Sequence, residues 1–339
     1  MTGSARAALL AVDGLRVTVP GAGRPILDGV ALTVRDGEAV ALVGESGSGK
    51  SVTARTALGL FPAGADVSGS VVVGGTEVVG AGSGALKRVR TADAAMIFQD
   101  PRAGVNPVRR IGDFLTEPLR RIRGESKAAA TARALELLGA VGLPDPPRHL
   151  RQFPHELSGG MLQRVMIAYA LTADPRLLLC DEPTTALDVT TQAEIMAILA
   201  RLRRERGLGM LLITHDLDLA AAVCDRVYVM YAGRIMEAAP SDVLIAAPRH
   251  PYTRGLLGSA PPLTGPLARL TPIPGAPLGL AETVGGCPFA ARCPHAVPGL
   301  CDTTEPEPEP EVDGDSMVAC LRAAELGASL IEETQGESS

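Results

Sequence analysis

The stretch that decides the fold reads Gly44-Glu45-Ser46-Gly47-Ser48-Gly49-Lys50-Ser51, which matches the pattern G-x-x-x-x-G-K-[ST] throughout. The apolar run that ends at Val43 is typical of a buried strand, and the residues from Ser51 through Val52 to Leu60 are typical of a helix. A glycine-rich turn between a strand and a helix points its backbone N–H groups at a phosphate, and the helix dipole adds positive potential. The sequence therefore predicts a binding site for nucleotide phosphates.

A second apolar run, Leu177-Leu178-Leu179-Cys180, ends in Asp181-Glu182. This order predicts two carboxylates at the end of a buried strand. Asp181 is suited to bind Mg²⁺ through water, and Glu182 is placed to polarise an attacking water. A strand end on the surface with two solvated acids is the plainer alternative, which the phosphate loop in the same chain disfavours.

Further candidate residues accompany these two motifs. Lys50 is expected to reach the outer phosphates of ATP, and Ser51 to coordinate Mg²⁺. Gln99 and His215 each follow an apolar strand. Gln99 can reach Mg²⁺ or water, and His215 can hydrogen-bond a γ-phosphate, although a lone Gln or His at a strand end is more often structural.

The tripeptide Ser158-Gly159-Gly160 predicts a helix start with a serine cap and exposed backbone N–H groups. By itself it is simply a capped helix. As a second anion-binding helix start, it is not needed by the ATP site of its own chain. A chain with both parts is suited to close around ATP as a dimer.

Composition limits the class of protein. The chain has 339 residues, of which 46% are hydrophobic and 21% charged, with a net charge of -6. The acidic balance argues against nucleic acid as the main partner. We find no apolar run of about 18 residues that could span a bilayer and no signal sequence. We therefore expect a cytosolic chain whose membrane role comes through a partner.

Alternating strand and helix patterns predict an α/β fold with a largely parallel sheet. The region from about 100 to 171 reads as a helical insertion. A helix over 191–206 is expected to begin with Thr191 and Glu194 as a capping box and to end at Gly207. After about 240 the chain is rich in proline, residues 305–311 are expected to pair as neither strand nor helix, and the tail from 334 is expected to be disordered.

Four stretches carry a resemblance to a known family. They are Phe98-Gln99-Asp100-Pro101 with Asn106-Pro107, Pro154-His155-Glu156-Leu157-Ser158-Gly159-Gly160-Met161, Asp181-Glu182-Pro183-Thr184-Thr185-Ala186-Leu187-Asp188-Val189-Thr190, and His250-Pro251-Tyr252-Thr253. The chain resembles the ATP-binding subunits of ABC importers of the oligopeptide, dipeptide and nickel permease group. The resemblance implies a P-loop ABC-ATPase cassette over 1–240, with a RecA-like core sheet, a β-subdomain and a helical subdomain. It also implies a cysteine-rich C-terminal extension over 241–339.

The resemblance also implies roles and partners. Glu182 would be the general base and His215 the switch residue, while Gln99 would join hydrolysis to the membrane subunits and Asp188 would link two ATP sites across a dimer. The implied partners are a second ABC ATPase, identical or related, two transmembrane permeases and an extracytoplasmic solute-binding protein. The chain would lie peripherally on the cytoplasmic face of the inner membrane.

Two positions depart from the family pattern. Val19 stands where the family often has an aromatic residue that stacks on adenine. Leu162 stands where Arg or Lys commonly follows the signature glycines. Adenine stacking is therefore the least supported part of the predicted site.

The last sixth of the chain contains Cys287, Cys293, Cys301 and Cys320. Four thiolates suit a zinc ion or an iron–sulfur cluster. Because no tight C-x₂₋₄-C pair is present, the spacing favours a [4Fe–4S] cluster over Zn²⁺, and the resemblance includes such a cysteine motif. Four free buried thiols are the plainer alternative, and His295 is a possible additional ligand.

Three function classes contain a phosphate loop of this kind. The first is an importer ATPase for di- or oligopeptides, or alternatively for nickel or a metal chelate. The second is a soluble ABC ATPase that acts on DNA or ribosomes; we find neither a heptad arm nor a second cassette to support it. The third is a P-loop kinase or GTPase, in which the signature and His215 would have no role.

Overall fold

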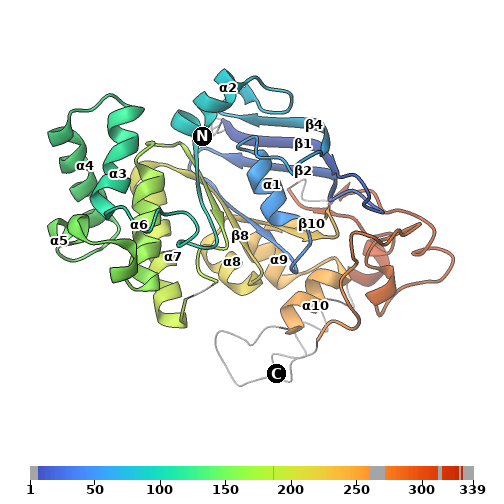
Figure 1. Cartoon of the computed structure of the whole chain (residues 1–339). Coiled ribbons are helices and arrows are strands. Elements are labelled where there is room, and N and C mark those ends of the chain that lie inside the picture. Colours follow the sequence, from blue (N-terminus) through green and yellow to red (C-terminus); the bar gives the residue numbers. More distant parts are fainter. Residues whose placement is uncertain (1–6, 186, 260–271, 312–314, 328–329, 331–339) are drawn as a thin grey trace, which may run out of the picture. The chain divides into compact units, whose positions relative to one another are not determined.

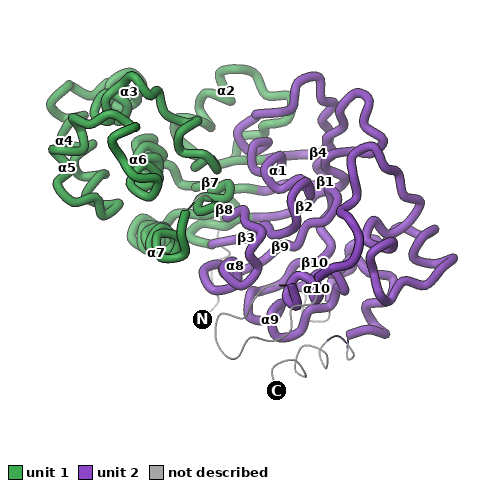
Figure 2. Tube along the Cα trace, turned by 60° about the horizontal axis from the view of Figure 1, so that its bottom comes forward, with its two compact units in different colours: residues 1–10, 34–38, 72–211 green, residues 11–33, 39–71, 212–339 purple. Residues whose placement is uncertain are grey.

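The structure is a computed structural model that describes residues 7–185, 187–259, 272–311, 315–327 and 330. It consists of two compact units, each built from separate stretches of the chain (Figure 2). Unit 1 contains residues 1–10, 34–38 and 72–211, and unit 2 contains residues 11–33, 39–71 and 212–339. The predicted disordered tail lies outside the described residues.

Four strands pass from one unit into the other along the chain: β1 (Ala8–Thr18), β2 (Leu27–Arg35), β4 (Asp66–Val73) and β8 (Gly209–Thr214). Val72 and Val73 of β4 pair antiparallel with β5 (Thr76–Glu77) and form a hairpin.

Unit 1 combines parallel strands with a group of helices. Its part of the larger sheet has the order β8-β7-β6, with β6 (Ala94–Ile97) parallel to β7 (Leu177–Asp181). Figure 1 shows α3, α4 and α6 side by side. The described helices of unit 1 are α2 (Ser83–Arg88), the π-helical turn η1 (Val89–Asp93), α3 (Ile111–Arg121), α4 (Lys127–Ala140), α5 (Pro146–Arg151), the 3-10 turn η2 (Pro154–Glu156), α6 (Gly159–Leu171) and α7 (Val189–Arg206).

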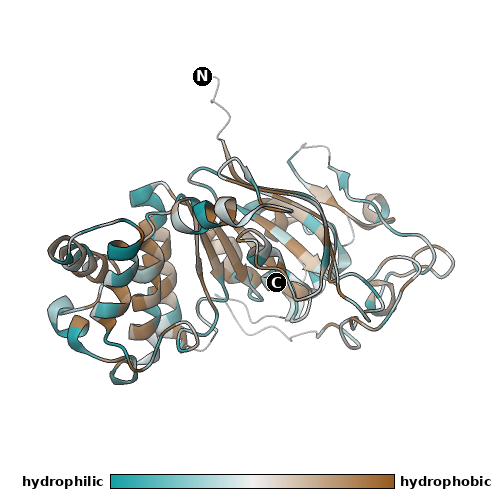
Figure 3. Cartoon of the chain, turned by 45° about the horizontal axis from the view of Figure 1, so that its top comes forward, coloured by the Kyte–Doolittle hydropathy of each residue, from teal (hydrophilic) through white to brown (hydrophobic). Residues whose placement is uncertain are grey.

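Apolar side chains at helical spacing hold this helical group together. In α3, Ile111, Leu115 and Leu119 are fully buried, as expected for residues four apart on one helix face. The rings of Phe114 in α3 and Tyr169 in α6 stack with centroids 4.2 Å apart. In Figure 3 the helices carry both polar and apolar colours, whereas the sheet strands are mostly apolar. Helices α3, α4, α5 and α6 lie within the block from about 100 to 171 that was predicted to be helical.

Unit 2 contains the other part of the larger sheet, in the order β11-β12-β10-β9-β3-β8. Strand β3 (Ala39–Val43) is completely buried and runs parallel to β9 (Arg226–Tyr231), which forms an antiparallel hairpin with β10 (Arg234–Pro240). The helices of unit 2 include α1 (Lys50–Thr56), α8 (Leu217–Val223), α9 (Ser241–Ala246), α10 (Pro251–Ser259) and the 3-10 turn η3 (Ala290–Arg292).

Two local predictions were wrong. Helix α7 begins at Val189, two residues before the predicted start, because the Asp188 carboxylate accepts the N–H of Thr191 and caps the helix. Residues 305–311 were expected to form no strand, yet β11 (Glu309–Pro310) pairs with β12 (Met317–Val318). An edge strand tolerates Pro310 because one side of it needs no donor.

Candidate functional site

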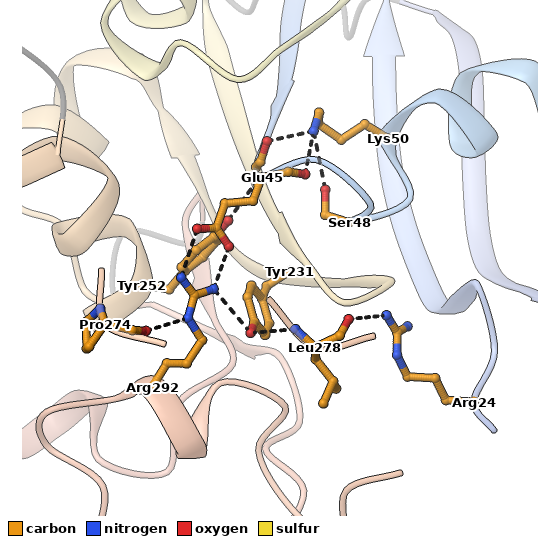
Figure 4. Close-up of polar contacts among 10 residues, drawn as sticks. Arg24, Glu45, Ser48, Lys50, Tyr231, Tyr252, Pro274, Leu278 and Arg292 are labelled. Atoms are coloured by element: carbon orange, nitrogen blue, oxygen red, sulfur yellow. Dashed lines mark hydrogen bonds and ion pairs between the residues drawn. The ribbon is translucent and has the colours of Figure 1, made fainter. Parts of the chain in front are cut away.

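The phosphate-loop motif of unit 2 lies between β3 and α1, as predicted from the sequence. Lys50 is only 4% exposed. Its Nζ donates hydrogen bonds to the carbonyl oxygens of Gly44 at 2.6 Å and Glu45 at 2.8 Å, and to Ser48 Oγ at 3.4 Å (Figure 4). The Lys50 ammonium group therefore lies within the turn that the phosphate loop makes. Ser51 and Val52 follow on α1 and are half-buried.

Close packing requires glycine at two positions of this loop. A Cβ on Gly44 would lie 2.1 Å from the carbonyl oxygen of Met230 in β9. Gly49 has a φ of 107°, and a Cβ there would lie 2.7 Å from Leu27 Cδ2. The backbone therefore lies directly against its neighbours, which fixes the direction of its N–H groups.

In unit 1, two predicted residues lie within hydrogen-bond distance of each other. Gln99 Nε2 donates to Glu182 Oε2 at 2.9 Å, and Thr185 Oγ1 donates to the same oxygen at 2.7 Å. Asp181 is fully buried at the end of β7. Glu182 has a φ of 45°, a left-handed conformation that is uncommon for a residue with a Cβ.

The signature helix and Asp188 also meet within unit 1. Ser158 Oγ accepts the N–H of Met161 at 3.3 Å, which confirms Ser158 as the cap of α6. A Cβ on Gly160 would lie 2.5 Å from Thr191 Cγ2, so α6 begins directly against α7. Thr191 donates its N–H and its hydroxyl to Asp188, and these bonds lower the pKa of the Asp188 carboxyl.

His215 lies in unit 2, one residue after the end of β8, and its side chain is exposed. The next residue, Asp216, caps α8 by accepting the N–H of Leu219 at 2.9 Å. A rigid strand and a capped helix thus flank His215, which fixes its backbone.

Sequence reasoning missed a group of side chains from the C-terminal part of unit 2 that contacts the phosphate loop. Tyr252 Oη accepts the N–H of Glu45 at 2.9 Å. Arg292 donates from both terminal nitrogens to the Glu45 carboxylate, at 2.6 and 3.0 Å (Figure 4). The only sequence signal was the His250–Thr253 motif, in which Tyr252 is the fully buried aromatic residue.

The four C-terminal cysteines are half-buried free thiols, whereas Cys180 and Cys224 are buried. Burial raises the pKa of Cys287 to about 11, and the charges of Cys320, Cys293 and Cys301 add to this shift. Burial also raises the pKa values of Cys293 and Cys320, with a contribution from Cys301 in both. The four thiols therefore lie within electrostatic range of one another.

The metal-site prediction is nevertheless not confirmed. Over residues 7–185, 187–259, 272–311, 315–327 and 330, no three His, Cys, Asp or Glu side chains are arranged to hold a metal ion. The backbone carbonyl of His295, which was the possible additional ligand, accepts a hydrogen bond from Arg322. In the same described residues, none of the helices has the length and apolar content that crossing a bilayer requires.

Comparisons with known proteins first define the class of protein to which the chain belongs. The family described as "ABC transporter" matches residues 27–185, and "Oligopeptide/dipeptide transporter, C-terminal region" matches residues 236–301. The chain is similar to the dimeric ATP-binding cassette MJ0796 bound to ADP and Pi, with a TM-score of 0.60 and 28% identity over 68% of this chain and 98% of that chain. It is also similar to cbiO1 from Clostridium perfringens, with a TM-score of 0.62 and 25% identity over 70% and 91% of the two chains. The predicted fold, an α/β P-loop ABC cassette, is confirmed.

Sequence relatives narrow the class. Identity is 48% to the oligopeptide transport ATP-binding protein OppD of Mycobacterium tuberculosis, over 93% of this chain and 52% of that protein. Identity is 44% to OppD of Salmonella typhimurium, over 88% and 89%, and 43% to the dipeptide transport ATP-binding protein DppD of Bacillus subtilis, over 88% and 90%. The chain belongs to the family of oligopeptide and dipeptide ABC-transporter ATP-binding proteins. It spans about half the length of the mycobacterial relative.

Proposed function

We propose that this chain binds and hydrolyses ATP as the energising subunit of an ABC importer for di- or oligopeptides. The observation that carries the proposal is one chain with a complete phosphate loop around Lys50, a capped signature helix at Ser158 and a match to the peptide-transporter C-terminal region. The cassette would occupy residues 1–240 and the extension 241–339. The start of the C-terminal family match at residue 236 supports this boundary.

In the proposed mechanism, the loop N–H groups and Lys50 bind the phosphates of ATP. Ser51, Asp181 and Gln99 offer the oxygen ligands that Mg²⁺ prefers, and Mg²⁺ would neutralise charge on the phosphates. The Glu182 carboxylate accepts a proton from the attacking water, and its hydrogen bond from Gln99 holds it in orientation.

His215 would hydrogen-bond the γ-phosphate. The backbone N–H groups at Ser158, Gly159 and Gly160 would bind the γ-phosphate of ATP held by a second ABC subunit. Asp188, which lies against the signature helix through Thr191, would link the two ATP sites.

The proposed assembly contains a second ATPase subunit, two transmembrane permeases and an extracytoplasmic solute-binding protein, with this chain on the cytoplasmic face of the membrane. The dimeric structure of the cassette MJ0796 supports pairing of two cassettes. The helical block from about 100 to 171 would receive the permeases. An importer for nickel or a metal chelate is the alternative within the same assembly.

The decisive experiment is capture of the Glu182→Gln chain from native membranes in ATP, with mass spectrometry of its partners. The amide removes the base but keeps an oxygen for the Gln99 bond, so ATP should stay bound. Recovery of two permeases and a peptide-binding protein supports the proposal, and a nickel-binding protein supports the alternative. Recovery of ribosomal or DNA-associated proteins alone overturns it. A Lys50→Ala chain is the control, because it should not close around ATP.

We further propose that Cys287, Cys293, Cys301 and Cys320 hold a [4Fe–4S] cluster that stabilises the folded extension. The mutual electrostatic effects among the four thiols of this proline-rich segment support the proposal. The cluster would supply four strong bonds to a segment with a small core. Purification without oxygen should give a brown protein with iron and sulfide. Stoichiometric zinc without visible absorbance would instead favour Zn²⁺.

A further inference from the structure

The contact between Arg292 and Glu45 joins two parts of unit 2 that are 247 residues apart in the sequence. The Arg292 side chain is 5% exposed and that of Glu45 is 25% exposed. The two bonds, at 2.6 and 3.0 Å, form a bidentate pair in which both carboxylate oxygens are used. Such paired, charge-assisted bonds are among the stronger and more directional contacts in proteins.

Arg292 is held from several other directions as well. Its Nε donates to the carbonyl oxygen of Pro274 at 2.8 Å, and its Nη1 donates to Tyr231 Oη at 3.4 Å. The guanidinium also lies over the rings of Tyr231 and Phe289, 5.7 and 5.9 Å from their centroids. The Arg292 side chain is therefore fixed by the extension and by β9. If the segment that contains Arg292 moves, the guanidinium moves with it.

That segment is the cysteine-rich one. Arg292 ends the turn η3 and is followed directly by Cys293. A backbone bond from Cys287 N–H to the Cys301 carbonyl, at 2.8 Å, closes the same segment. Any rearrangement of the cysteines therefore moves the guanidinium relative to the phosphate loop.

Charge gives this contact a consequence for the ATP site. Glu45 is the second residue of the phosphate loop, and its carbonyl oxygen accepts a bond from Lys50 at 2.8 Å. An unpaired carboxylate there would repel the triphosphate. Arg292 neutralises this carboxylate and binds it on the side away from Lys50 (Figure 4). Because the pair is largely desolvated, loss of the cation would leave a poorly solvated negative charge in the loop.

We propose that Arg292 is a positioning residue of the ATP site, which holds the Glu45 carboxylate away from the phosphates and makes nucleotide affinity depend on the conformation of the cysteine-rich segment. This inference rests on the phosphate loop being the ATP site and is independent of what the importer carries. By linkage, nucleotide binding changes the stability of the segment by the same free energy.

The test compares the full-length chain with three variants. Arg292→Gln removes the cation. Arg292→Gln with Glu45→Gln removes the pair and with it the repulsion. Arg249→Gln is the matched control, because Arg249 pairs with Glu311 of the same extension at 3.1 Å and makes no described contact with the phosphate loop. Affinity is measured with a fluorescent ADP analogue and Mg²⁺, and thermal unfolding is followed for every variant.

We expect Arg292→Gln to weaken nucleotide binding by about tenfold, which corresponds to ~1.4 kcal/mol. The double variant should recover to within about threefold of the parent chain, and the control should be unchanged. KM for ATP should rise while kcat at saturating ATP stays within about twofold, since the lost contact acts on binding. Hydrogen exchange should show that Mg²⁺-ADP protects residues 287–301 in the parent and in Arg249→Gln, but not in Arg292→Gln.

Several results would overturn the inference. One is an unchanged nucleotide affinity in a folded Arg292→Gln chain. Another is a double variant that binds as weakly as the single one, because Arg292 would then not act through Glu45. A third is equal exchange of residues 287–301 with and without nucleotide in the parent. If the parent chain itself binds no nucleotide, the proposed function fails, and this outcome is distinct from the other three.

Discussion

A buried pair of titratable side chains beside the His250–Thr253 motif should make stability depend on pH. Glu237 in β10 is 2% exposed, and its two carboxylate oxygens accept the N–H groups of Arg249 and His250 at 2.7 and 2.9 Å. His250 is 1% exposed, and its Nδ1 accepts the N–H of Tyr252 at 3.0 Å. Tyr252 in turn accepts the N–H of Glu45 in the phosphate loop, so this pair is linked to the ATP site through Tyr252.

Burial raises the pKa of Glu237 from 4.5 to about 7. Between these two pH values the folded chain keeps a proton that the unfolded chain has lost. The free energy of unfolding therefore falls as pH rises through the window. At about 1.36 kcal/mol per pKa unit, the fall amounts to roughly 3 kcal/mol.

Burial lowers the pKa of His250 from 6.5 to about 3, against the opposing effect of a hydrogen bond with the Ala319 backbone. In this window the unfolded chain holds the extra proton, so the free energy of unfolding rises with pH, by roughly 5 kcal/mol in all. The two slopes oppose each other from pH 4.5 to 6.5. Replacement of Glu237 should therefore leave the rise of the unfolding free energy with pH that His250 causes.

The perturbation is Glu237→Gln, with urea unfolding measured at about pH 5 and about pH 7.5. The amide keeps only one of the two oxygens that accept these N–H groups, so one N–H loses its acceptor and the variant starts with a constant penalty of about 1–3 kcal/mol. Relative to the parent chain, the variant should gain roughly 3 kcal/mol between the two pH values. Glu205→Gln is the control, because Glu205 pairs with Arg201 in an exposed position and should leave the slope unchanged.

A Glu237→Gln chain whose stability difference from the parent is the same at both pH values would refute this reasoning. The carboxyl would then ionise at an ordinary pKa despite its burial, and the two N–H groups would stabilise the anion more than desolvation destabilises it. A change in slope for Glu205→Gln as well would point to a general charge effect.

Three further predictions concern the proposed ATP site. Glu182→Gln should lower phosphate release by about 10²–10⁴-fold and leave nucleotide affinity unchanged, and a fully active variant would exclude Glu182 as the base. Gly44→Ala should weaken nucleotide binding by about a hundredfold, measured by fluorescence titration, because its Cβ meets the Met230 carbonyl oxygen at 2.1 Å and displaces the loop; an unchanged affinity would contradict the close packing. Gly160→Ala should lower ATPase activity by about tenfold or more, and Thr191→Ser should restore most of it because the clashing methyl is then absent; a lack of rescue would count against this contact.

Local pattern was enough to predict the parts of the site that lie within one strand–turn–helix segment. The phosphate loop has its own signal in glycine spacing, and Ser158 has one in the polar cap before an apolar helix. Helix α7 was harder, because Asp188 and Thr191 are both good caps and only the hydrogen bonds decide between them.

Contacts between distant segments could not be predicted in this way. Nothing in the pattern around Cys293 indicates that the preceding Arg292 binds a carboxylate 247 residues earlier. The short strand at Pro310 was also missed, because the proline-rich composition argued against its pairing with Met317. Such contacts depend on tertiary packing, which overrides local preference.

The backbone of Glu182 has a consequence for how this chain changes under selection. Its φ of 45° suits glycine or asparagine, and a longer side chain there costs about 1 kcal/mol. A library of variants chosen only for heat tolerance should therefore become enriched in chains that have replaced the proposed base. Such survivors would be more stable and still able to hold nucleotide, yet unable to turn it over. Stability screens on this chain consequently need a turnover assay beside them.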